Sequence, residues 1–272
     1  MTGKPRSIPT RALSLCARAV PDISPVEVIT VAMDTGYEAV GFAFDDMAEL
    51  DRSLAHELRK RIDDSPLFAL DIDVIRVRPG PLATADFHFL DCAAEIGVQH
   101  VLVVSQDPDF DQTTEKFSVL CDHAAGVGLG IVFEFLRITD YRTLDDAFVI
   151  VNGANRANGK ILIDTLHLAR AGHEPKDIAR FDPALFPYVQ FCDGAAEVDL
   201  KDFEALVFDA REGRFSPGEG ALPLGEMLSY IAADTALSIE VRSRDLNQRF
   251  PDPVERARHL NLACKKLLES LS

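Results

Sequence analysis

Three carboxylates and one amide lie at or near the ends of apolar stretches in the second half of the chain. They are Glu134 in IVFEFL, Asp164 in ILIDT, Gln190 in YVQFCD and Glu240 in LSIEV. Carboxylates rarely stay buried without a partner, so these side chains are candidates for chemistry. Three converging carboxylates repel one another unless a cation neutralises them. Such an all-oxygen set favours Mg2+ or Mn2+ over Zn2+, which more usually binds His or Cys.

Each of these side chains also has a purely structural interpretation. Asp164 precedes the helix-like stretch TLHLAR, and taken alone it is better explained as a helix N-cap. Glu134 and Glu240 could form ion pairs with the arginines that follow them, Arg137 and Arg242. The Gln190 amide could simply form hydrogen bonds within the core. The occurrence of all four groups at the ends of successive strands favours the metal site over these separate explanations.

Strand-like and helix-like segments alternate along the chain, and this order must bring the four side chains together. The predicted strands are continuous apolar runs, as expected where both faces of a parallel sheet are covered. They span 12–17, 39–44, 67–77, 100–105, 130–136, 160–165, 188–192 and 236–241. Helical segments are predicted at 24–36, 50–62, 84–97, 113–128, 143–154, 165–172, about 200–233 and 253–271.

Eight such units predict a (β/α)8 TIM barrel formed as a single domain by residues 1–272. A doubly wound sheet is the competing fold, but ALSLCARAVPDIS offers no Gly-rich phosphate loop after the first strand. Active sites of barrels lie at the C-terminal ends of the strands. The four oxygen-bearing side chains come from the fifth to the eighth strand and would therefore curve around half of the barrel mouth.

Charge and composition limit the partners. The net charge of −16, from 28 basic and 44 acidic residues, argues against nucleic acid and anionic membranes. No apolar run is long enough to span a bilayer, and Arg18 interrupts the apolar part of the N-terminal stretch, which makes it a poor signal peptide. Five scattered cysteines without a CxxC pair fit reduced thiols. These features predict a cytoplasmic protein that binds small molecules, and they leave homo-oligomer formation open.

Two further regions could contribute to a pocket. In GRFSPGEGALPL, Pro217, Gly218 and Gly220 predict a tight turn that could place Arg214 over the barrel mouth. A guanidinium there could bind a carboxylate, a phosphate or vicinal hydroxyls, whereas an ordinary surface loop is the alternative. Three polar residues of the third strand are candidates for lining the pocket, and the sequence does not tell which of them face it: Asp71, Asp73 and Arg76.

Five stretches, taken in order, resemble the xylose isomerase-like barrel superfamily, the sugar phosphate isomerase/epimerase group: IVFEFLRIT, ILIDTLHLARAG, YVQFCDG, GRFSPGEGALPL and LSIEVRS. The resemblance implies a divalent metal held by Glu134, Asp164, Gln190 and Glu240, with His167 and Arg214 contacting substrate oxygens. Many members have His where this chain has Gln190, while relatives similar to hydroxypyruvate isomerase and 3-dehydroshikimate dehydratase have Gln. The endonuclease IV branch is disfavoured, because its zinc cluster needs several more histidines.

The expected function is a metal-dependent isomerase or epimerase that acts on a small sugar, ketose or keto acid through an enediolate. Mn2+ or Mg2+ would act as a Lewis acid, Glu134 and Glu240 would move the proton, and His167 would meet a substrate oxygen or shuttle a proton. A metal-dependent dehydratase, similar to 3-dehydroshikimate or inosose dehydratase, would use the same residues. A barrel that binds a sugar-like ligand without turning it over is the alternative of another class.

Overall fold

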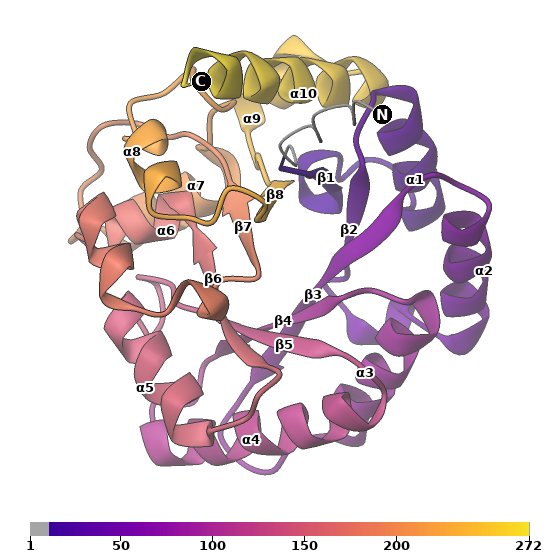
Figure 1. The fold of residues 1–272 in the computed structure, drawn as a ribbon, viewed down its shortest axis with the longest axis vertical. Helices are drawn as coiled ribbons and strands as arrows, with labels where there is room; N and C mark the ends of the chain where they lie inside the picture. Colours follow the sequence, from indigo (N-terminus) through magenta and orange to yellow (C-terminus); the bar gives the residue numbers. More distant parts are fainter. Residues whose placement is uncertain (1–10, 272) are drawn as a thin grey trace, which may run out of the picture.

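Eight short apolar runs form the parallel strands of a closed barrel in the computed structural model, which describes residues 11–271 (Figure 1). Each strand pairs with the next in the chain, and the eighth pairs with the first. The strands are β1 (Leu13–Cys16), β2 (Ala39–Ala43), β3 (Phe68–Val77), β4 (His100–Ser105), β5 (Gly130–Glu134), β6 (Gly159–Asp164), β7 (Tyr188–Phe191) and β8 (Ala236–Ile239). The predicted (β/α)8 barrel is therefore confirmed. Residues 1–10 and 272, including the start of the stretch considered as a signal peptide, lie outside the described residues.

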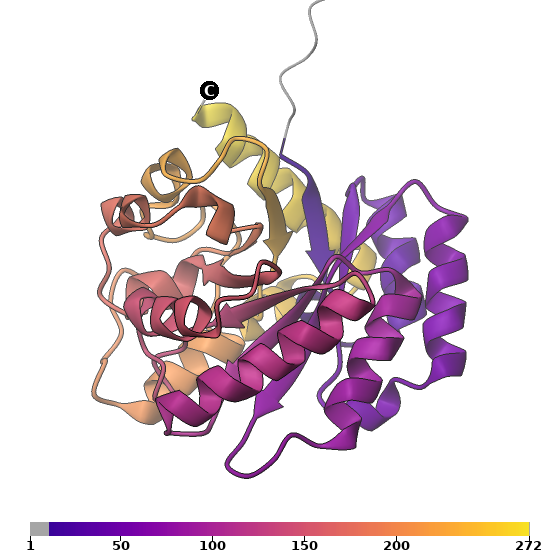
Figure 2. The ribbon, with the colours of Figure 1, turned by 60° about the horizontal axis from the view of Figure 1, so that its bottom comes forward.

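Helices surround the strands on all sides in Figure 1, and Figure 2 shows the strands running obliquely inside this outer layer. The α-helices are α1 (Pro25–Asp34), α2 (Arg52–Asp63), α3 (Thr84–Ile96), α4 (Phe110–Gly126), α5 (Leu144–Ala154), α6 (Thr165–Arg170), α7 (Phe203–Glu212), α8 (Leu224–Ser229), α9 (Arg244–Arg249) and α10 (Pro253–Ser270). Short 3-10 helices span Ala17–Ala19, Met47–Glu49, Pro175–Arg180 and Pro183–Leu185. Among residues 11–271, no helix combines the length and apolar character needed to cross a bilayer.

The region predicted as helical from about 200 to 233 is two helices, and that prediction was wrong between them. The segment between α7 and α8 is an irregular loop held by the carboxylate of Asp193, which follows β7. Asp193 accepts hydrogen bonds from the backbone N–H groups of Gly194, Gly218, Gly220 and Leu222 at 2.8–3.1 Å. These bonds replace those that a continuous helix would make. The tight turn expected in this loop is thus present.

The direction of the site side chains follows from the alternation of side chains along each strand. Val132, Leu162 and Tyr188 belong to an apolar cluster inside the barrel. Two residues later on the same strands stand Glu134, Asp164 and Gln190, which must therefore face the barrel axis too. A second, larger cluster fills the space between strands and helices. The polar strand ends thus sit on top of a packed interior rather than on an open channel.

Candidate active site

Glu134, Gln190 and Glu240 form one connected group at the C-terminal mouth of the barrel. They lie at the end of β5, within β7 and directly after β8, and each is at most 5% exposed. When the Gln190 amide nitrogen faces the carboxylates, it donates hydrogen bonds to Glu134 Oε1 at 3.3 Å and Glu240 Oε2 at 3.1 Å. In the opposite orientation the amide oxygen faces both carboxylates, and three oxygens then converge on one space.

Asp164 has both of its carboxylate oxygens engaged. Its Oδ1 accepts the backbone N–H groups of Leu166 and His167 at 2.8 and 3.1 Å, so Asp164 is indeed the N-cap of α6. Its Oδ2 lies 2.6 Å from Nη1 of Arg214. Burial alone would raise the pKa of Asp164, but Arg214, His167 and these hydrogen bonds outweigh burial and lower it. The structural and the chemical interpretations of this residue are therefore compatible.

Arg214 lies deeper than the tight turn after it suggests. It was expected over the mouth, whereas its side chain is 2% exposed and lies among the strand ends. Its Nε donates to the carbonyl of Ala210 at 2.9 Å, and Nη1 lies 3.4 Å from Glu240 Oε2. The reason is the path of the loop, since Arg214 N–H donates to the carbonyl of Arg242, after β8, at 3.1 Å. The guanidinium therefore serves two of the buried carboxylates as a counterion.

His167 stands at the first turn of α6, between Glu134 and Arg214. Its Nε2 lies 3.9 Å from Glu134 Oε1 and 3.4 Å from Arg214 Nη2. Burial lowers the pKa of His167 to about 4, although Asp164 opposes the shift. The imidazole is therefore neutral at pH 7 and can both donate and accept a hydrogen bond.

Two of the carboxylates are poised to hold or release a proton. Burial, followed by the charges of Asp164 and Glu240, raises the pKa of Glu134 well above its ordinary value. Burial also raises the pKa of Glu240, although Arg214 opposes it. In the described residues neither carboxylate pairs with the arginine that follows it, the alternative considered from the sequence. Buried acids with raised pKa values in a pocket are typical of functional sites.

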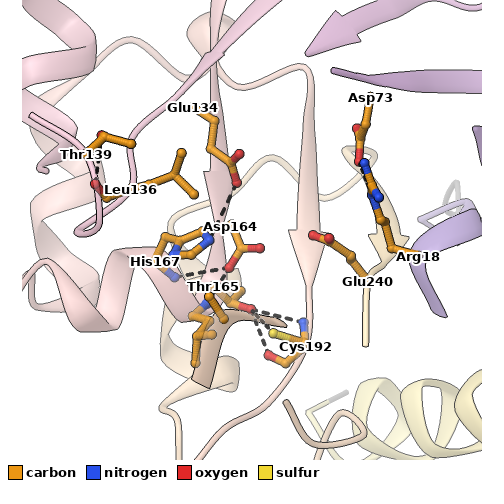
Figure 3. A network of polar contacts seen from close by, with 12 residues as sticks. Arg18, Asp73, Glu134, Leu136, Thr139, Asp164, Thr165, His167, Cys192 and Glu240 are labelled. Carbon is orange, nitrogen blue, oxygen red and sulfur yellow. Dashed lines mark hydrogen bonds and ion pairs between the residues drawn. The ribbon is translucent and has the colours of Figure 1, made fainter. Parts of the chain in front are cut away.

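The third strand contributes to the opposite side of the pocket. Asp73 and Arg76 line it, together with Arg18 from the turn after β1, while Asp71 is buried beneath it and does not line it. Arg18 Nε lies 3.7 Å from Asp73 Oδ2. Figure 3 shows this pair across from Glu134 and Asp164, with Glu240 between the two sides. Of the three polar β3 residues, Asp73 and Arg76 therefore face the pocket.

The residues present fit a divalent cation. Glu134, Asp164 and His167 each offer one ligand atom, and these atoms lie within 4.8 Å of one another. Gln190 adds an amide that turns an oxygen toward Glu134 and Glu240 in one of its two orientations. Several carboxylate oxygens, one amide oxygen and one neutral imidazole form a donor set that Mg2+, Mn2+ and Zn2+ all accept.

The fold and the site together define the chain as a TIM barrel with a cluster of buried acids at its C-terminal mouth. The model of the xylose isomerase-like TIM barrel family matches residues 29–263. The chain belongs to this family, as its motifs indicated. No curated protein matches the sequence.

Solved structures of low sequence identity share the fold. The IOLI protein with a bound zinc atom has a TM-score of 0.76 at 18% identity, with 96% of this chain and 97% of that chain covered. D-psicose 3-epimerase in the presence of D-fructose has a TM-score of 0.72 at 14% identity, with 94% of this chain and 99% of that chain covered. The probable 3-DHS dehydratase AsbF from Bacillus anthracis has a TM-score of 0.69 at 18% identity, with 92% of this chain and 98% of that chain covered.

A longer protein is also similar. It is a fusion of a xylose isomerase-like TIM barrel with a 4-hydroxyphenylpyruvate dioxygenase, with a TM-score of 0.80 at 18% identity. This chain is covered to 96%, but it spans 43% of the length of the fusion protein.

Two residues near the site were not singled out from the sequence. Asp193 anchors the loop that carries Arg214, and the CDG at 192–194, directly after a predicted strand, was its available signal. Arg18 reaches the pocket from a 3-10 turn, Ala17–Ala19, that no local sequence pattern predicts. Its position at the end of the first predicted strand was the one signal available.

Proposed function

We propose that this protein is a divalent-metal-dependent isomerase or epimerase of a small polyhydroxy ketone or keto acid. The observation that carries the proposal is the Gln190 amide within 3.3 Å of Glu134 and 3.1 Å of Glu240. This arrangement brings an amide and two carboxylates from three strands to one point, beside Asp164 and His167. Membership of the family and similarity to a sugar epimerase support the same assignment.

Glu134, Asp164, Gln190 and Glu240 would hold the metal. A bound divalent ion supplies Lewis-acid stabilisation of negative charge that develops on a substrate oxygen. Glu134 and Glu240 approach from strands on different sides of the mouth, so one can take a proton from a substrate carbon and the other, or the same one, can return it. Their raised pKa values suit groups that take up and release a proton. His167, neutral and beside Glu134, would hydrogen-bond the substrate oxygen.

Mn2+ and Mg2+ remain the metals proposed from the oxygen-rich donor set. A similar barrel holds zinc, and His167 within the cluster would suit that ion too. Metal analysis of the purified protein, followed by reconstitution with each ion after EDTA treatment, identifies the ion that supports turnover.

A dehydratase is the second candidate, supported by the likeness to a probable 3-DHS dehydratase. It would use the same proton abstraction, followed by loss of a β-hydroxyl as water. The metal-loaded protein should be offered ketoses, inososes, hydroxypyruvate and 3-dehydroshikimate in D2O, with proton NMR as the readout. Exchange of a substrate C–H proton with retention of all hydroxyl groups supports an isomerase or epimerase. Formation of an unsaturated product supports a dehydratase.

Glu240→Gln is the decisive variant. It keeps the size of the side chain but removes the charge and the base, so turnover should vanish while the fold persists. Full activity of this variant would refute the proposed roles. Saturable binding of a sugar by a protein that exchanges no proton would favour the non-catalytic binding barrel instead.

A further inference from the structure

The pocket is lined by far more positive charge than the composition of the chain leads one to expect. The net charge of the whole chain is −16. The lining nevertheless includes five arginines, which come from β3, α7 and the segments after β1, α7 and β8: Arg18, Arg76, Arg211, Arg214 and Arg242.

Two of these arginines are neutralised within the protein. Arg214 pairs with Asp164 and Glu240, as described above. Arg18 lies 2.6 Å from Asp45 and 3.7 Å from Asp73. These guanidinium groups are already paired with carboxylates, so they are not free to meet a ligand charge.

The other three arginines lack such partners. In the part of the chain that the structure describes, the guanidinium groups of Arg242 and Arg211 make no hydrogen bond or ion pair. Arg76 Nη2 makes a long ion pair of 3.9 Å with Asp45 Oδ1. The same oxygen accepts a hydrogen bond of 2.6 Å from Arg18 Nη1. An arginine has five N–H donors and stays charged, so these groups have unused binding capacity.

Arg76, Arg211 and Arg242 all line the same pocket. Arg242 and Arg76 are both partly buried there. Burial and the charge of Arg18 lower the pKa of Arg76, against the opposing charges of Asp45 and Asp73. Mutual repulsion between the partly buried Arg76 and Arg242 is unfavourable, and an anion between them and the exposed Arg211 would relieve it.

We infer that Arg242, together with Arg76 and Arg211, binds an anionic group of the substrate, a carboxylate or a phosphate. The inference rests on the proposed function, because it assigns this group to the substrate of the same pocket. The acidic strand ends would then receive the reacting carbons and hydroxyls, while the arginines fix the charged end. A neutral sugar would bring no negative charge to these three cations.

Anion binding is tested first without substrate or metal. EDTA-treated protein is titrated with inorganic phosphate and with pyruvate, at ionic strength held constant with NaCl, and the unfolding midpoint and heat of binding are measured. We expect saturable binding of at least one anion. Arg242→Gln should weaken it about tenfold, as expected for the loss of a charge-assisted contact, and Arg242→Lys should restore part of it. Arg258→Gln, an exposed arginine on α10, is the matched control.

Matched pairs of compounds then separate a carboxylate from a phosphate. The metal-loaded protein is offered hydroxypyruvate against dihydroxyacetone, and a ketopentose 5-phosphate against the free ketopentose. Preference for the anionic member of one pair, lost in Arg242→Gln, supports the inference and identifies the group. Equal use of neutral and anionic members overturns it while the proposed function stands.

Absence of saturable anion binding, or equal affinity in wild type and Arg242→Gln, also overturns the inference. Because this titration requires no turnover, it decides the inference even where no compound exchanges a proton in D2O. Failure of the proposed function and failure of anion recognition are therefore distinguishable.

Discussion

Arg214 Nη1 lies 2.6 Å from Asp164 Oδ2, and both side chains are almost completely buried. The pair joins the loop after α7 to the end of β6. The same nitrogen lies 3.4 Å from a carboxylate oxygen of Glu240, so one guanidinium links two strands of the barrel. Removal of one partner from a buried ion pair leaves an uncompensated charge, which costs more than the pair itself contributes.

Arg214→Gln should therefore lower the free energy of unfolding of the metal-free protein by about 3 kcal/mol. Added Mn2+ should recover part of the loss, because a cation at the strand ends would neutralise the same carboxylates. Urea unfolding with EDTA and with MnCl2 measures both effects, and Arg258→Gln is the control. An equal loss under both conditions would mean that Arg214 and the metal do not share carboxylates.

Two substitutions of Asp164 separate its capping role from its proposed role as a metal ligand. Asp164→Asn keeps an oxygen for the N–H groups of Leu166 and His167, while Asp164→Ala removes it. The Ala variant should be less stable than the Asn variant by about 1 kcal/mol. Both should bind Mn2+ more weakly than the wild type. Urea unfolding and calorimetric titration with Mn2+ give the two readouts, and unchanged Mn2+ affinity in Asp164→Asn would contradict the ligand role.

Stability should fall in acid partly because of His100, at the start of β4. Burial lowers its pKa to about 4, and its ring stacks on Tyr188 with centroids 5.4 Å apart. The unfolded histidine has a pKa near 6.5, so between about pH 6.5 and 4 this residue binds a proton in the unfolded chain but not in the folded chain. Stability is therefore full above this window and declines as the pH falls through it.

His100→Phe keeps a stacked ring but removes this titration. Its stability curve should be shallower between pH 6.5 and 4, by up to about 1.4 kcal/mol per pH unit. Some slope should persist, because the pKa of the buried His167 is lowered as well. Urea unfolding at a series of pH values gives the comparison. Parallel curves for the variant and the wild type would show that His100 is not responsible.

The loop that carries Arg214 should tolerate no side chain at Gly220. A Cβ atom there would lie 2.4 Å from Asp193 Oδ1 and 2.5 Å from the carbonyl oxygen of Gly194. Gly220→Ala should lower the free energy of unfolding by about 2 kcal/mol, as overpacking of a tight site does. Gly126→Ala, where a Cβ meets nothing within 4 Å, is the control in the same assay. A neutral Gly220→Ala would show that Asp193 and its loop can shift at little cost.

Local pattern was sufficient for the strands and for the acidic strand ends. Buried parallel strands need continuous apolar runs, and a run such as Ile161–Ile163 can be recognised without knowledge of its neighbours. Once eight strands are placed in order, their C-terminal ends must share one rim, so Glu134, Asp164, Gln190 and Glu240 had to come together. Family resemblance pointed to the same positions.

Long-range contacts account for what the sequence did not predict. The helix expected across 200–233 is interrupted because Asp193, on another element, binds the backbone of the loop. The burial of Arg214 follows from a hydrogen bond to Arg242, 28 positions away, which no local pattern encodes. Helix α9 was missed because Ser243 caps a stretch of only six residues, too short for a clear apolar period.

The Gln190 amide gives the site a property that a fourth carboxylate would not. Its two ends have nearly the same shape, but one donates hydrogen bonds and the other accepts them. A half-turn about one side-chain bond would therefore replace the hydrogen-bond donor between Glu134 and Glu240 by an oxygen of the kind that the proposed metal requires, while the strands stay where they are. If Gln190 binds a metal in this way, the barrel with and without the ion could share one backbone, and metal binding would require no refolding of the mouth.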